Sequence, residues 1–169
     1  GLVSIYLIYK IGQKLFNNKP VSLLATYLLS TSLVFVQISH LAKVWIPQVM
    51  SILLAFYFII ILYQRQEDKI KDYLFVGLSL GLAFGVHVIG IVVYASFFFA
   101  HYLKNSSKKF KDIFLTNNYF WLVNIIILIF YFLIFYLNPY GFQNYINRDG
   151  KIWPNFNFLF APGATANVS

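Results

Sequence analysis

The sequence predicts an all-α, polytopic integral membrane protein with full spans and a pair of short helices that form a hairpin. Of its 169 residues, 60% are hydrophobic, 21% are aromatic and only 11% are charged. A soluble domain of this size could not bury so much apolar surface, whereas a bilayer can act as its solvent. The basic residues lie in short clusters between apolar runs, as loops at an anionic membrane surface do.

Charge and composition also exclude several classes of function. The net charge of +8 could indicate nucleic acid, but its placement in inter-helical clusters favours membrane lipids as partners. Cysteine is absent, which rules out disulfides, thiolate metal sites and a cysteine nucleophile within these residues. The sequence contains no Walker loop, zinc signature or nucleophile elbow, so it identifies no metal site and no cofactor.

The apolar runs define the transmembrane region, 1–137. The chain opens with Gly in the middle of a hydrophobic run, without a basic region ahead of it, so we expect a piece of a longer protein. Residues 1–9 are then the tail of a truncated span, followed by a basic loop at 10–19. The next span, 21–38, is entered at Pro20, a residue suited to a first helical turn.

Two further spans lie at 44–63 and 119–137. Each is close to the roughly 20 residues that cross a bilayer. The second one ends at a turn signal, Asn138-Pro139-Tyr140-Gly141. We expect residues 138–169 to form an extracytoplasmic loop or the start of the following region.

The apolar run 73–102 decides the predicted topology. As one helix it would be about 45 Å long, against a hydrocarbon core of about 30 Å. A single crossing divides the thirteen Lys and Arg residues 8 to 5 between the two sides, whereas a reversal near residue 87 divides them 10 to 3. Because basic residues favour the cytoplasmic side, we predict two short helices, 73–86 and 88–102. The alternative is one long tilted helix.

His87 lies at the predicted reversal, in the stretch GLAFGVHVIG. An ionisable side chain at membrane depth is costly unless it is paired or hydrated, so His87 is a candidate site residue. The alternative is a neutral imidazole bonded to a carbonyl that the helix break frees. Gly77, Gly81 and Gly85 recur every fourth residue before it, which predicts a closely packed neighbouring helix.

The other candidates lie on the predicted outer side. The turn SHLAKVWIP places His40 and Lys43 where a phosphate or sugar could bind, although Trp and Lys also serve as interfacial anchors. Arg148 is a further candidate cation. Asp149 is the one acidic residue on this side, and it is a weak acid–base candidate because Asp-Gly also forms simple surface turns. The charged runs 64–71 and 104–111 are predicted to be solvated cytoplasmic loops.

Three stretches resemble the membrane region of family 39-type glycosyltransferases of the C superfamily, which includes protein O-mannosyltransferases and bacterial lipid-carrier-dependent aminoarabinose transferases. They are a span, basic loop and next span (GLVSIYLIYKIGQKLFNNKPVSLLATYLLSTS), an outer turn with its following span (ISHLAKVWIPQVMSILLAFYFIIIL) and a glycine-rich segment (YLFVGLSLGLAFGVHVIGIVVY). The resemblance covers about residues 1–102. It implies inverting hexosyl or pentosyl transfer from a polyprenyl-phosphate-linked sugar to a lipid, protein or glycan acceptor at the extracytoplasmic face of the plasma or inner membrane.

The sequence departs from that family at two positions. Trp45 stands where the family often has Asp, and His87 stands where its glycine-rich segment usually has Lys. The resemblance also implies that the catalytic carboxylate lies in an external loop ahead of Gly1, so no residue here takes that role. Two other functions stay open at this point: a transporter or flippase fragment, in which broken helices form midplane sites, and a structural membrane subunit.

Overall fold

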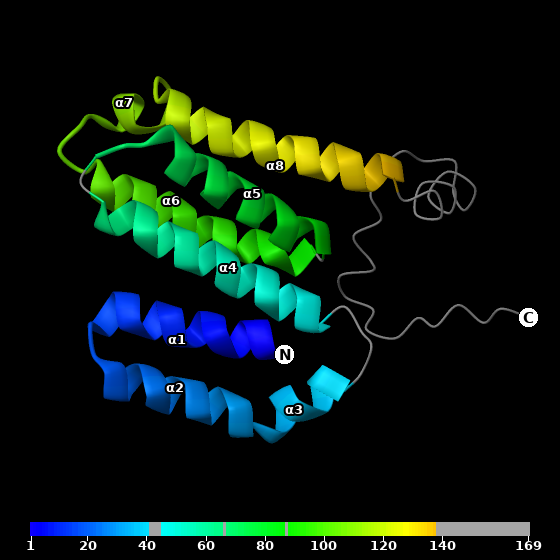
Figure 1. The fold of residues 1–169 in the computed structure, drawn as a ribbon. Helices are drawn as coiled ribbons and strands as arrows, with labels where there is room; N and C mark the ends of the chain where they lie inside the picture. The colour runs from blue at the N-terminus through cyan, green and yellow to red at the C-terminus, as the bar shows by residue number, and fades with distance from the viewer. Residues whose placement is uncertain (41–44, 66, 87, 138–169) are drawn as a thin grey trace, which may run out of the picture. The chain divides into compact units, whose positions relative to one another are not determined.

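The computed structural model is built of helices, and its described residues, 1–40, 45–65, 67–86 and 88–137, contain no strand (Figure 1). Residues 1–131 form one unit, and the end of the last helix belongs to a second unit, 132–169. The elements are α1 Leu2–Phe16, α2 Lys19–Thr31, α3 Leu33–His40, α4 Trp45–Gln64, α5 Ile70–Val86, η1 Val88–Ile91, α6 Val92–Lys104, α7 Phe110–Phe114 and α8 Asn118–Leu137.

Helix α1 continues well past the predicted end at residue 9, so the expected basic loop 10–19 is wrong. Lys10 and Lys14 are four residues apart and therefore lie on one helix face, which leaves the apolar residues between them free to pack. The helix ends at Asn17, whose φ of 46° and ψ of 32° form a left-handed cap. Asn18 then caps α2 by accepting a hydrogen bond from the Val21 amide at 3.2 Å. The connection is thus a two-residue turn.

The predicted span 21–38 is also wrong as a single helix, because it breaks at Ser32 into α2 and α3. The hydroxyls of Ser30 and Thr31 donate to the carbonyl of Tyr27 at 2.9 and 2.8 Å, in competition with the helical hydrogen bonds. Ser32 itself has an extended backbone, with ψ at 116°, and its hydroxyl lies 3.5 Å from the amide of Phe35 in the position of an N-cap. Three consecutive hydroxyl residues thus end one helix and begin the next.

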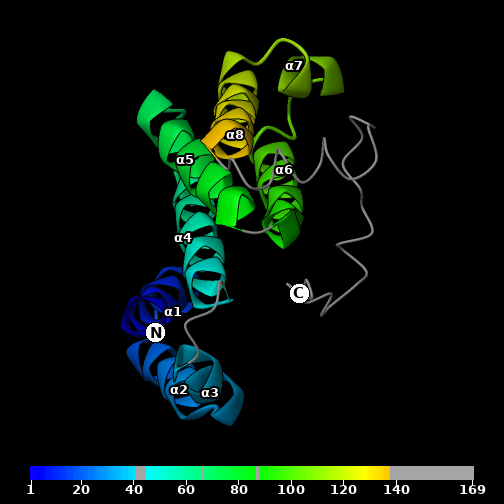
Figure 2. The ribbon, with the colours of Figure 1, turned by 90° about the vertical axis from the view of Figure 1, so that its right-hand side faces the viewer.

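Helix α4 is the central element, and it contacts α1 on one side and α5 and α6 on the other (Figures 1 and 2). Its buried face carries Ser51, Ala55, Ile59 and Leu62. Among the described residues, 46–64 is the one helix that is long and apolar enough to cross a membrane by length and composition. The segments 89–104 and 118–133 are shorter apolar helices.

The chain reverses direction between α5 and α6. Lys104 at the end of α6 lies 2.8 Å from Asp68, which precedes α5, so the end of α6 lies beside the start of α5. At the reversal, η1 packs so tightly on α5 that a Cβ on Gly90 would lie 2.1 Å from the carbonyl oxygen of Ala83. Only glycine fits at this position, because the obstructing atoms belong to backbone. Residue 87 lies outside the described residues.

The glycine stripe of α5 packs against α8, as a small-residue stripe predicts. A Cβ on Gly77 would meet Ile126 at 2.8 Å, and one on Gly81 would meet the ring of Phe130 at 2.7 Å. The two glycines therefore let α8 approach α5 closely.

The run 104–111 is not simply a solvated loop, because it leads directly into helix α7. Ile113 and Phe114 of this short helix are buried, and Phe114 stacks on Phe98 of α6 at 4.5 Å between ring centroids. Phe120 of α8 packs edge-on against Phe114 at 5.1 Å. Helix α7 thus joins the aromatic core that α6 and α8 form.

Candidate functional site

Four of the five site residues predicted from the sequence lie outside the described residues, and the side chain of the fifth is not described. His87, Lys43, Arg148 and Asp149 lie in gaps of the described chain, and of His40 the backbone alone is described, as the last residue of α3. The described helices nevertheless show at which end of the bundle the residues that flank two of these gaps lie. Because α4 and α5 are antiparallel neighbours, the start of α4 and the end of α5 share one end of the bundle. Both gaps, 41–44 and 87, are therefore bounded by helix termini at that end.

Gln48 is a polar residue at this end that sequence reasoning missed. It lies one turn into α4, is 3% exposed, and neither atom of its amide has a hydrogen-bond partner among the described residues. A buried amide without a partner costs on the order of 1–3 kcal/mol. Such a group is a candidate for contact with a ligand. A single Gln inside an apolar run was the available signal, and it was overlooked.

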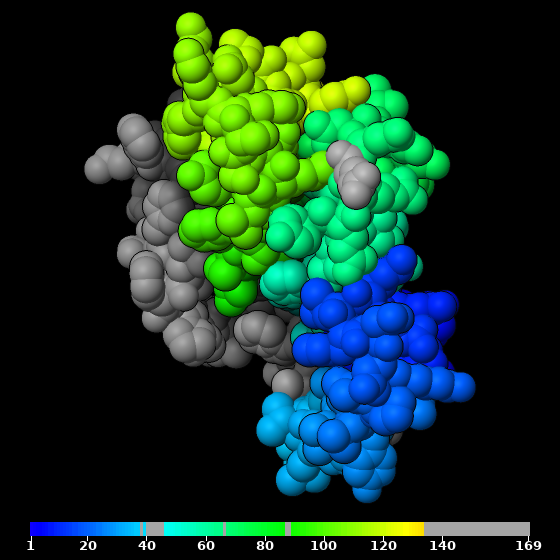
Figure 3. All heavy atoms as spheres, turned by 90° about the vertical axis from the view of Figure 1, so that its left-hand side faces the viewer, coloured from blue at the N-terminus to red at the C-terminus, as the bar shows by residue number. Residues whose placement is uncertain are grey.

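All Lys and Arg residues of the described chain lie at or near the opposite end, which we call the basic end. Figure 3 faces this end, where α6 and α7, the α4–α5 junction and α1–α2 meet the surface. Its basic residues come from three clusters: Lys10, Lys14 and Lys19; Arg65, Lys69 and Lys71; and Lys104, Lys108, Lys109 and Lys111. Four acids, Glu67, Asp68, Asp72 and Asp112, lie here too. The charge partition that the sequence predicted for the hairpin is thus matched by the placement of these residues.

A polar network at the basic end joins α5, α6 and α7. Lys104 lies 2.8 Å from Asp68, and the hydroxyl of Tyr73 donates to the same carboxylate at 2.9 Å. The Tyr73 hydroxyl also lies 3.2 Å from Nδ1 of His101, whose Nε2 is 3.0 Å from the carbonyl oxygen of Ile113. Tyr73 and His101 are fully buried.

The hydrogen-bond partners of His101 determine which of its two ring nitrogens must carry a hydrogen. The carbonyl of Ile113 only accepts, so Nε2 of His101 must carry a hydrogen. If Tyr73 donates to Asp68, its oxygen can accept from Nδ1 only when that nitrogen is protonated as well. A protonated His101 would satisfy all three hydrogen bonds at once, but the burial of the ring disfavours its charged form. With a neutral ring, Asp68 and Nδ1 share the one hydroxyl hydrogen of Tyr73.

The Asp68 carboxylate is held in its charged form. Burial by itself raises the pKa of Asp68, but hydrogen bonds from Lys104 and Tyr73 and the charges of Lys104 and Lys108 outweigh it, so that its pKa falls below the ordinary 3.8. A second pair, Arg65 and Asp72, lies beside it at 2.7 Å between Nη1 and Oδ2. These contacts tie the start of α5 to the helices on either side.

Sequence reasoning missed this network because the charged runs were interpreted as solvated loops. The signal was present in the predicted hairpin, since Tyr73 and His101 lie equally far along the chain from residue 87. A reversal at that point brings the two side chains opposite each other. Among the described residues, no group of three His, Asp or Glu side chains could hold a metal ion.

A family model described as dolichyl-phosphate-mannose-protein mannosyltransferase matches residues 1–136. The chain belongs to this family. Searches of curated proteins and of solved structures found no match.

Membership in the mannosyltransferase family confirms the resemblance inferred from the three sequence stretches. The match also extends past those stretches, through α7 and nearly all of α8. Because the family is one of membrane glycosyltransferases, membership supports that class for this chain. No observation on the described residues favours the transporter alternative.

Proposed function

We propose that this chain is part of a transferase that moves a sugar from a polyprenyl-phosphate-linked donor to a lipid, protein or glycan acceptor at the extracytoplasmic face. The observation that carries the proposal is the family match over residues 1–136. In this reaction the bond between the anomeric carbon and the donor phosphate oxygen breaks, and the electron pair leaves with the phosphate. The acceptor oxygen forms the new bond with inversion, and its proton passes to a general base.

The placement of charge supports the orientation that we propose. The described Lys and Arg residues gather at the basic end, and such residues favour the cytoplasmic side of a membrane. The opposite end, where the gaps 41–44 and 87 open, would then be extracytoplasmic. Donor binding at that end would use His40, Lys43 and His87, with Arg148 from the chain beyond α8.

The chemistry of the donor explains the residue types. A departing phosphate needs positive charge or hydrogen-bond donors where its own charge develops, and Lys43, Arg148 or a protonated His87 would supply them. Gln48 adds a buried amide at the same end. Asp149 is the weaker proposal for the acid–base role. The residues described here offer no carboxylate at that end, so we do not assign the general base to them.

The proposal is tested by replacing His87 in the full-length protein. We expect His87→Ala to lower transfer from a polyprenyl-phosphate sugar about 10- to 100-fold at limiting donor, because one charge-stabilising contact is lost. Membrane insertion should be unchanged. Lys111→Ala is the matched control, since it removes a charge at the basic end. Transfer by His87→Ala at the wild-type rate would exclude this residue from the donor site.

A further inference from the structure

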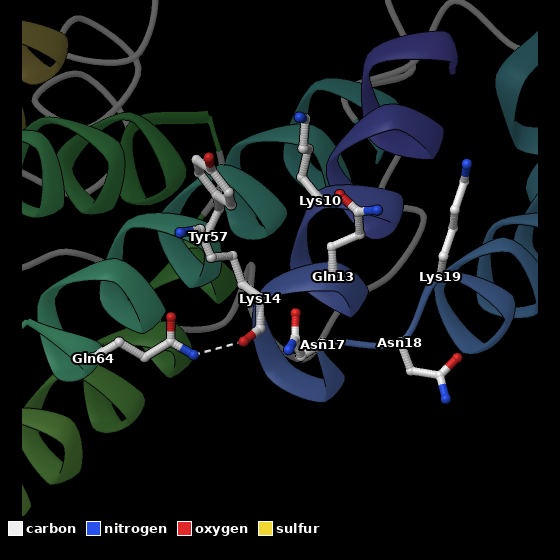
Figure 4. A pocket seen from close by; sticks show the side chains of 8 residues that line it. All are labelled: Lys10, Gln13, Lys14, Asn17, Asn18, Lys19, Tyr57 and Gln64. Atoms are coloured by element: carbon white, nitrogen blue, oxygen red, sulfur yellow. Dashed lines mark hydrogen bonds between the residues drawn. The ribbon is translucent and has the colours of Figure 1, made fainter.

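A polar recess opens at the basic end between α1, the start of α2 and the last two turns of α4 (Figure 4). Its volume is about 530 Å³. Lys10, Lys14 and Lys19 line it, and Figure 4 shows their side chains reaching outward from α1 and the first turn of α2. The recess lies at the end of the bundle opposite to the proposed sugar-transfer site, so it is a separate feature.

The three lysines of the recess have no carboxylate partner in the described chain, unlike three of the basic residues near the start of α5. Arg65 binds Asp72, Lys69 binds Glu67 and Lys104 binds Asp68. None of the described residues that line the recess is acidic. Lys10 makes a cation–π contact with Tyr6, at 5.5 Å from the ring centroid, which leaves its charge uncompensated. The recess thus gathers three lysines without a carboxylate beside them among the described residues.

Side-chain amides complete the walls of the recess. Gln64 donates its amide to the carbonyl oxygen of Lys14 at 2.6 Å and so fixes the end of α4 against α1. The side-chain oxygen of Asn18 accepts the hydrogen bond from Val21, which leaves its NH₂ group available as a donor. Gln13 and Asn17 lie between the lysines. The lining therefore offers positive charge and hydrogen-bond donors.

We propose that this recess binds a phosphate group, carried either by an anionic lipid headgroup or by a soluble phosphate compound. Lysine is a point-charge ligand for phosphate, and the lack of a carboxylate removes the repulsion that would exclude it. The recess is at the end of the helices where bilayer headgroups would lie, and basic pockets between helices at that depth bind acidic headgroups. The inference does not depend on the identity of the transferred sugar.

Two matched triple variants of the full-length protein test the proposal. The recess variant is Lys10→Gln, Lys14→Gln and Lys19→Gln. The control, Lys71→Gln, Lys109→Gln and Lys111→Gln, removes the same charge from the basic end outside the recess.

The binding of phosphate is measured in two experiments. The first measures retention of phosphatidic acid in phosphatidylcholine nanodiscs by native mass spectrometry. The other measures binding of inorganic phosphate to protein in nanodiscs of phosphatidylcholine alone. No sugar donor is present, so the result is independent of transfer activity.

We expect the recess variant to bind about tenfold or more weakly than the control, because charge-assisted hydrogen bonds are lost. A difference in the phosphatidic acid arm alone assigns the recess to a lipid headgroup, and one in the inorganic phosphate arm assigns it to a soluble phosphate. Equal binding by both variants, or no binding in either arm, overturns the proposal. If the recess triple variant does not fold, Lys14→Gln and Lys19→Gln singly give the same comparison, since both lysines are exposed.

Discussion

At the scale of single residues, the reversal between α5 and α6 depends on the missing side chain of Gly90. An added Cβ would lie 2.1 Å from the carbonyl oxygen of Ala83, and neither backbone can yield without separating η1 from α5. Gly90→Ala should therefore destabilise the protein by about 3 kcal/mol or more, at the upper end of overpacking costs. The helix propensity that alanine gains, about 1 kcal/mol, is too small to offset this. A lower Tm of the purified full-length protein would show the effect.

Gly77→Ala is the comparison for that measurement. Its Cβ would meet Cδ1 of Ile126 at 2.8 Å, which can rotate away, and the Ile126 Cβ at 3.2 Å, which has to shift by only a few tenths of an ångström. The loss in Tm should be clearly smaller than for Gly90→Ala. Equal losses would mean that the backbone contact at Gly90 is not what limits substitution.

Residue-scale chemistry was only partly predictable from the sequence. Gly77 and Gly81 signalled a close helix neighbour through their spacing, and α8 is that neighbour. His101 was not singled out although its spacing from residue 87 equals that of Tyr73, because a histidine near the end of an apolar run resembles an interfacial residue. Its burial depends on contacts from α5 and α7, which are distant in sequence. His87 remains a prediction from the sequence.

At the scale of helices, the Asp68–Lys104 pair holds the start of α5 against the end of α6. Its contribution depends on pH in a direction that follows from the lowered pKa of Asp68. A carboxyl whose pKa is lower in the folded state stabilises the fold above its unfolded value near 3.8, and this stabilisation is lost as pH falls through the folded pKa. Lys104→Gln should lower stability near neutral pH by about 1–3 kcal/mol. The difference from wild type should shrink below about pH 4.

The measurement is Tm against pH for wild type, Lys104→Gln and the control Lys111→Gln. Lys104 is 7% exposed and Asp68 22%, so solvent screens the pair only in part. Parallel profiles for wild type and Lys104→Gln, with no convergence at acid pH, would contradict a role for this ion pair.

Helix boundaries were predicted well where apolar length decided them and poorly where local hydrogen bonds did. The prediction 44–63 lies within one residue of α4, and 119–137 within one residue of α8. The break at Ser32 was missed because hydropathy does not register three hydroxyls that bond the backbone. Helix α7 was not predicted because four nearby lysines lower the local hydropathy, although Ile113 and Phe114 are buried.

At the scale of the whole molecule, the distribution of Lys and Arg is the property that the sequence predicted most directly. A hairpin at residue 87 places ten basic residues on one side of the membrane, and those ten are described and lie at one end of the helices. The roles of the loops could not be predicted in the same way. The count of Lys and Arg predicts which loops lie on the same side of the membrane. It does not predict which lysines form ion pairs with acidic residues and which line the recess.

The positive charge of the basic end predicts that this end faces the cytoplasm when the protein is in a membrane. The 169 residues contain no cysteine, so single cysteines can be introduced without competing thiols from this part of the protein. We expect Lys19→Cys, Lys71→Cys and Ser106→Cys to react with a membrane-impermeant maleimide from the cytoplasmic side, because positively charged ends stay there. Ser39→Cys, on α3 near Gly1 and at the other end, should react from the opposite side. Labelling of Ser106→Cys from the same side as Ser39→Cys would mean that α5 and α6 cross the bilayer as one helix, and it would contradict both the hairpin and the orientation of the transfer site.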